Sequence, residues 1–201
     1  MKKISISIAA ILIALNATAQ GSFNDSIALS RNRLKQNAMV VLGGCAAANI
    51  ATGFIAANNT VGDTKYFWRM NAYWNFVNLG LAGFGYVAAQ KGFGKTYSLS
   101  GNYTAQKSIE RLYLVNAGLD VAYIAGGLLL VNKGNKETIV DKKDQYHGYG
   151  KSIAAQGAFL LLMDGALVLL HHKNTTAVKS RQGQVWLNVG PGIVALNVSF
   201  R

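Results

Sequence analysis

The chain has 201 residues, which is enough for one domain or one helix bundle. Hydrophobic residues make up 51% and charged residues only 14%, against about a quarter charged in soluble domains. The formal charge of +12 could indicate nucleic acid, but the basic residues lie in short segments between apolar runs. We therefore expect lipid headgroups as counter-ions and no nucleic-acid partner. A single cysteine, Cys45, excludes an internal disulfide and any thiol oxidoreductase that needs a cysteine pair.

Residues 1–19 have the pattern of a secretory signal peptide. Two lysines precede an apolar stretch, and Ala17-Thr18-Ala19 matches a small-x-small cleavage site. This pattern predicts an exported bacterial protein whose mature chain begins at Gln20. The alternative is an uncleaved anchor helix.

Four long apolar stretches follow a polar lead at residues 20–35. Each is close to the 20 residues that cross a bilayer as a helix. They predict an all-α membrane protein, a four-transmembrane-helix bundle over residues 36–172. The predicted spans are about 38–57, 68–90, 112–132 and 152–172.

Small residues recur every four positions in two of these spans. Such stripes allow helix backbones to approach closely, so we expect them at helix contacts. The stripes are Gly44, Ala48 and Thr52, and also Asn49, Gly53 and Ala57, in the first span, and Gly118, Ala122 and Gly126 in the third.

Asparagines mark one face of the second span. Asn71, Asn75 and Asn78 are spaced so that they share one side of a helix, while the remaining surface is apolar or aromatic. Amides facing lipid would carry a desolvation cost, so this face should meet other helices. Asn102, by contrast, is expected in a glycine-containing loop at 91–103, where its loss should matter less than that of Asn75.

Asp120 and Asp164 are the only acidic residues well inside the predicted spans. Counted from the ends of two antiparallel helices, both lie about 12 Å in from the same side, so we expect them to be neighbours. One interpretation is a proton or cation site. The other is packing, with each carboxyl bonded to nearby amides. The predicted intramembrane polar network is Asn49, Asn71, Asn75, Asn78, Asn116, Asp120, Gln156 and Asp164.

Three histidines raise the question of a metal or haem site. His147 and His171 lie at opposite ends of the fourth span, about 36 Å apart along a helix, so they cannot share a site. His171-His172 is explained by the preference of histidine for a helix C-terminus. We predict no catalytic residues, no metal site and no cofactor.

Residues 173–201 are predicted to form a polar linker and a short C-terminal β-hairpin. Two runs rich in β-branched residues flank Gly190-Pro191-Gly192. Because an isolated two-stranded hairpin is marginal, it should dock on the bundle, a membrane surface or a partner.

The order of these polar and aromatic residues resembles an uncharacterised family of small exported bacterial proteins with four predicted membrane helices. The resemblance covers roughly residues 30–172 and brings no established activity. The family pattern implies a polar residue, often His, at the position where this chain has Trp68. This departure from the pattern argues against metal or proton chemistry at that position. The motifs are Tyr66-Phe67-x-x-Met70-Asn71-x-x-Trp74-Asn75-x-x-Asn78, Asn116-Ala117-Gly118-Leu119-Asp120-x-x-Tyr123, Gly148-Tyr149-Gly150, Gln156-Gly157 and Asp164.

Three functions remain open, in order of preference. The first is a non-enzymatic membrane protein that acts as a scaffold or accessory subunit, with the bilayer and a second copy or another membrane protein as partners. The second is a small ion- or proton-coupled carrier or channel component using Asp120 and Asp164. The third is a membrane-embedded enzyme. The signal peptide predicts the inner membrane with both mature termini extracytoplasmic, whereas the distribution of basic residues favours the opposite orientation.

Overall fold

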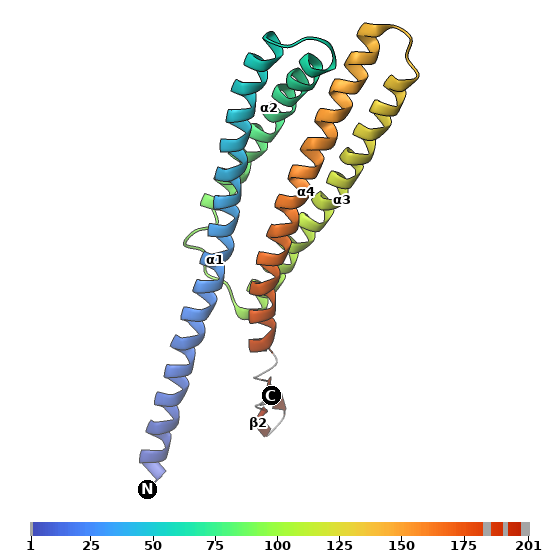
Figure 1. Ribbon diagram of the computed structural model, residues 1–201. Helices are drawn as coiled ribbons and strands as arrows, with labels where there is room; N and C mark the ends of the chain where they lie inside the picture. Colours follow the sequence, from blue (N-terminus) through green and yellow to red (C-terminus); the bar gives the residue numbers. More distant parts are fainter. Residues whose placement is uncertain (1, 183–185, 191–192, 198–201) are drawn as a thin grey trace.

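The computed structural model describes the backbone of residues 2–182, 186–190 and 193–197, and the side chains of residues 22–181. Long helices account for nearly all of it (Figure 1). They are α1 (Lys2–Asn58), α2 (Gly62–Gln90), α3 (Leu99–Asn135) and α4 (Val140–Gln182).

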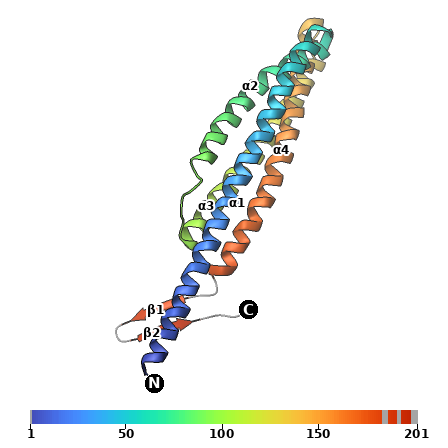
Figure 2. The same ribbon diagram turned by 90° about the vertical axis from the view of Figure 1, so that its left-hand side faces the viewer.

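The helices form two antiparallel hairpins that lie against each other. α1 packs on α2, α3 packs on α4, and the main contact between the hairpins is α2 against α4 (Figures 1 and 2). No Cα atom of α2 lies within 8 Å of one in α3. The bundle has two ends, which carry the polar connections between the helices. One holds the α1–α2 and α3–α4 turns, and the other holds the α2–α3 connection and the C-terminal end of α4.

Several segments predicted to be polar connections are helical instead. The lead at 20–35 is part of α1, and α3 begins at Leu99, well before its predicted span. Ser98 caps α3, since its hydroxyl accepts a hydrogen bond from the Gly101 amide at 3.1 Å. Without proline to stop them, the helices extend beyond their apolar stretches. α1 also runs unbroken through the predicted signal-peptide cleavage site.

The predicted fold class needs correction in its β part. Over residues 22–181 the structure is 91% helix with no strand, so the fold is an all-α bundle and a β-hairpin does not belong to it. Beyond this range, β1 (Trp186–Gly190) and β2 (Ile193–Asn197) pair with each other, and no Cα atom of either strand lies within 8 Å of one in the described helices. A two-stranded sheet buries too little surface to add a layer. Residues 191–192 of the predicted turn lie outside the described residues.

Glycines bring helices into close contact at one of the predicted glycine positions and at several others. The prediction for Gly53 of α1 is confirmed, because a Cβ there would lie 2.9 Å from the Trp68 carbonyl oxygen of α2. A Cβ on Gly127 of α3 would lie 2.5 Å from the Gly150 carbonyl oxygen of α4 and 2.6 Å from the Ala154 nitrogen. In contrast, nothing lies within 4 Å of a Cβ placed on Gly44, Gly118 or Gly126. The predicted contact stripes are therefore wrong at these three glycines. Successive residues of an α-helix are rotated by about 100° around the helix axis. Gly127 therefore faces the inside of the bundle, while Gly126 faces outward.

The outer surface has the character expected of a protein in a membrane. Three helices are long and apolar enough to cross a bilayer, where four were predicted: Ser22–Asn58, Leu99–Asn135 and Val140–Arg181. α2 does not meet that criterion because its buried asparagines lower its hydropathy. It nevertheless carries no charged residue between Arg69 and Lys91. Large apolar side chains such as Phe84 (82% exposed) and Leu129 (69% exposed) face outward, which is unusual for a soluble monomer.

Candidate functional site: a polar interior and an acidic cavity

A chain of side-chain amides runs through the interior and connects three helices. Asn71 of α2 donates to Oδ1 of Asn49 in α1 at 2.9 Å, and its own Oδ1 accepts from Gln156 of α4. Asn75 donates to the Asn71 carbonyl at 2.7 Å, and Asn78 donates to Oδ1 of Asn75 at 3.3 Å. The structure thus places these five predicted residues in one continuous network, with Asn71 at its centre.

Asp120 of α3 and Asp164 of α4 lie together in the interior. Both are at least 95% buried, and their carboxyl groups interact with each other. Asn116 lines the same cavity as Asp164, and Oδ2 of Asp120 has no hydrogen-bond partner among the described residues. The antiparallel packing of α3 and α4 brings the two carboxyls to the same depth, as counting residues from the helix ends predicts.

A cavity of about 570 Å³ lies next to the two carboxyls. It is bounded by all four helices and occupies the space between α2 and α3, whose backbones stay apart. Trp74 and Tyr123 bridge these two helices edge to face, with ring centroids 4.8 Å apart. The polar residues that line the cavity are Asn78, Asn116, Asp120, Asp164, Lys35 and the two tyrosines, Tyr113 and Tyr123.

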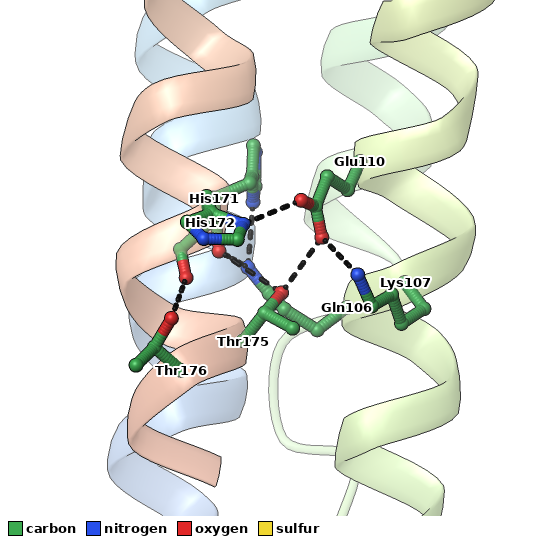
Figure 3. Close-up of polar contacts among 7 residues, drawn as sticks. All are labelled: Gln106, Lys107, Glu110, His171, His172, Thr175 and Thr176. Atoms are coloured by element: carbon green, nitrogen blue, oxygen red, sulfur yellow. Dashed lines mark hydrogen bonds and ion pairs between the residues drawn. The ribbon is translucent and has the colours of Figure 1, made fainter. Parts of the chain in front are cut away.

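A second polar cluster joins α3 to the C-terminal part of α4 (Figure 3). The Glu110 carboxylate lies 2.7 Å from Nδ1 of His172 and 3.2 Å from Nζ of Lys107, and accepts from the Thr175 hydroxyl at 3.1 Å. Gln106 Nε2 lies 2.9 Å from Nδ1 of His171 and donates to the His171 carbonyl at 3.0 Å. The two histidines therefore have specific partners on α3, in addition to their place near a helix end.

Next to this cluster, Arg31 of α1 is buried without an acidic partner among the described residues. It is 2% exposed, and its guanidinium donates to Oδ1 of Asn102 at 2.8 Å and lies 4.6 Å from the centre of the Tyr97 ring. Asn102 in turn donates to the Asn24 carbonyl at 2.9 Å. The prediction that Asn102 lies in a loop is wrong: it is fully buried in α3.

Sequence reasoning missed this cluster because it began the third span at Leu112. A signal was present, since the buried residues of α3 repeat at intervals of three, four and seven, the spacing of one helix face. They are Asn102, Gln106, Glu110, Tyr113, Asp120, Gly127 and Gly134.

At the other end of the bundle, an ion pair and a tyrosine connect α2 with α4. Lys151 lies 2.6 Å from Asp63, and its hydrogen bond lowers the pKa of that carboxyl. Tyr66 donates to Asp141 at 2.6 Å, and this bond raises the pKa of the phenol. His147 also lies in this part of the bundle, against Gly134, far from His171. Among the described residues, no group of three or more His, Cys, Asp or Glu side chains could hold a metal ion.

These features define a helical bundle with a polar interior and three helices suited to crossing a membrane. The chain belongs to a family of unknown function (DUF6992), whose sequence pattern matches residues 41–165. The matched region contains both interior aspartates and the whole amide network, and the resemblance to an uncharacterised family is confirmed. No curated protein and no solved structure matches the chain.

Proposed function

We propose that this is a non-enzymatic integral membrane protein that binds a proton or small cation at Asp120 and Asp164. The observation that carries the proposal is that these two carboxyls lie side by side at one cavity. Each is the one acidic residue in its predicted span, 112–132 or 152–172. Two neighbouring carboxylates in a medium of low polarity cannot easily both be ionised without a counter-charge. Ionisable residues at such depth in a membrane protein usually serve a function.

Within residues 22–181, no basic side chain forms an ion pair with Asp120 or Asp164. Lys35 is the one basic residue that lines the cavity among the described residues. It lies on the side of the cavity toward His171. His171 is seven residues from Asp164 along α4, or about 10 Å. A proton or an external cation is therefore the available counter-charge for the carboxyls.

For the cellular setting, we propose four crossings of the bacterial inner membrane after export by a cleaved signal peptide. α2 would be the fourth crossing, shielded by its neighbours through the asparagine face. Both mature termini would then lie on the extracytoplasmic side. A second copy or another membrane protein would cover part of the apolar surface.

Labelling with dicyclohexylcarbodiimide in membranes tests the carboxyl site. The reagent adds to a protonated carboxyl in apolar surroundings and gives a stable N-acylurea on that side chain. We expect mass spectrometry to find the adduct on Asp120 or Asp164, and the signal to disappear in the double variant Asp120→Asn/Asp164→Asn. Asp144→Asn, at a polar end of the bundle, is the matched control and should keep the label. Absence of any adduct on both aspartates would refute the site.

A second candidate function is a scaffold or accessory subunit, which the amide network favours. In this case Asp120 and Asp164 only pack, as Asn71 and Gln156 do, and asparagine at both positions preserves folding and function. Copurification of a stable partner that survives the double asparagine variant would support this candidate.

A further inference from the structure

The size and walls of the cavity beside Asp120 and Asp164 do not suit a bare ion. A single water occupies about 30 Å³ of liquid, whereas the cavity holds about 570 Å³. Organic ligands of drug size occupy pockets of about 300–1,000 Å³ with mostly apolar walls. Most of the lining is apolar here too, and it includes Met39, Leu81, Phe84, Leu119 and Met163.

Most of the polar side chains in the cavity favour a positively charged ligand. Oδ2 of Asp120 is unpartnered although the residue is only 3% exposed. Tyr113 and Tyr123 add aromatic rings, which attract cations through their faces. The cavity thus combines an acidic end, aromatic side chains and an apolar body.

We propose that this cavity binds a lipophilic amine, with the ammonium group at Asp120 and Asp164 and the apolar body against the α2 and α3 side chains. This inference rests on the proposed function and names the class of ligand for the same carboxyl pair. An ammonium group provides the counter-charge that the pair needs and donors for the free oxygen of Asp120.

The ligand would enter from the bilayer between α2 and α3, beside Phe84 and Leu112 and about 15 Å along the helices from the Trp74–Tyr123 bridge. The backbones of α2 and α3 do not come within contact distance, and cavity-lining side chains on both helices are exposed: Phe84 at 82% on α2, and Leu112 at 54% on α3. Lys35 repels a cation from its own end of the cavity, which directs the ammonium group to the aspartates.

Calorimetric titration of the full protein in nanodiscs tests the proposal with two matched probes, 1-naphthylmethylamine and 1-naphthylmethanol. The two share one aromatic body and differ in charge at neutral pH. We expect the amine to bind at least about tenfold more tightly than the alcohol, because a hydrogen bond to a charged group is the main difference. Asp120→Asn/Asp164→Asn should remove this preference and leave the weak alcohol binding unchanged.

A steric variant provides an independent test. Leu119→Trp would fill the cavity and should weaken amine binding, whereas Leu129→Trp, on the same helix but not lining the cavity, should not. Equal binding of amine and alcohol, or amine binding that survives both Leu119→Trp and the double asparagine variant, would overturn the inference. If carbodiimide still labels the aspartates in that case, the proposed proton or cation site stands and only the ligand class fails. If labelling is absent as well, both fail.

Discussion

Gln156 of α4 donates its side-chain amide to Oδ1 of Asn71 in α2, and this hydrogen bond joins the two helical hairpins at a buried position. The same asparagine also bonds to Asn49 of α1. One side chain therefore connects three helices, α1, α2 and α4. In an apolar surrounding, such a bond selects one arrangement of helices, because each alternative leaves a buried amide without a partner.

Asn71→Leu should consequently destabilise the bundle more than removal of any single exposed amide. Interhelical hydrogen bonds in membranes contribute about 0.6 kcal/mol on average, so loss of the several bonds of Asn71 should cost roughly 1–2 kcal/mol. Asn59→Leu is the control, since this exposed side chain bonds only to its own helix, at the Ile55 carbonyl. Unfolding by SDS in mixed micelles gives both free energies. Equal losses for the two variants would show that the interior network adds nothing to stability.

The position of the asparagine face was predictable because it depends on local geometry alone. Asn71, Asn75 and Asn78 share a side of any regular helix, and the cost of exposing amides to lipid turns that side inward. The depth of Asp120 and Asp164 followed from counting residues along two antiparallel helices. Neither inference required knowledge of which residues pair across the bundle.

Gly127→Ala should weaken the contact between α3 and α4, because the added methyl would lie 2.5 Å from the Gly150 carbonyl oxygen. Overpacking of this kind costs about 1–3 kcal/mol. Gly126→Ala, one residue earlier, places its methyl in open space and should be neutral or stabilising by up to about 1 kcal/mol through helix propensity. Thermal unfolding in detergent measures both. A loss of the same size in the two variants would contradict the packing described for α3.

Asn102→Leu should be among the most damaging substitutions, the reverse of what a loop position implies. It removes the oxygen that accepts from the buried Arg31 guanidinium, and a hydrogen bond to a charged group contributes about 1.5–3 kcal/mol. The variant Arg31→Met should lower that cost when combined with Asn102→Leu, because no buried charge is then left unpartnered. Purely additive losses in this double-mutant cycle, measured by SDS unfolding, would mean that the two side chains do not interact.

The Arg31–Asn102 and Gln106–His171 contacts could not be predicted from the sequence. Each joins residues more than 60 positions apart. The Arg31–Asn102 contact depends on how one hairpin lies against the other, and the Gln106–His171 contact depends on how α3 and α4 align within their hairpin. The glycines near Asn102 also suggested a loop, although only Gly94 there has a positive φ, of 73°. Ser98 starts the helix after it, and the tertiary contacts of α3 outweigh the weak preference of Gly101 for a turn.

The Asp63–Lys151 ion pair should make stability depend on pH below about 4. Lys151 lowers the pKa of Asp63 in the folded state, so the contribution is complete above the unfolded-state pKa of about 4 and is lost as pH falls through the lower folded-state value. Because the pair is partly exposed, we expect Lys151→Met to cost about 0.2–1 kcal/mol at pH 7 and almost nothing near pH 2. Lys142→Met, which removes a lysine with no ion pair among the described residues, is the control. A Lys151→Met penalty that persists unchanged at pH 2 would exclude charge pairing as its cause.

Cysteine labelling in intact cells would determine the orientation, using a Cys45→Ala background. Ser180 is exposed near the end of α4, and Lys142 is exposed near its beginning, so the two positions mark opposite ends of the bundle. If the signal peptide sets the topology, a membrane-impermeant maleimide should label Ser180→Cys in intact cells and Lys142→Cys only after the membrane is disrupted. The reverse pattern would show that the excess of basic residues at the Ser180 end directs insertion, as the positive-inside rule favours. Labelling of both positions in intact cells would contradict a bundle that crosses the membrane along its length.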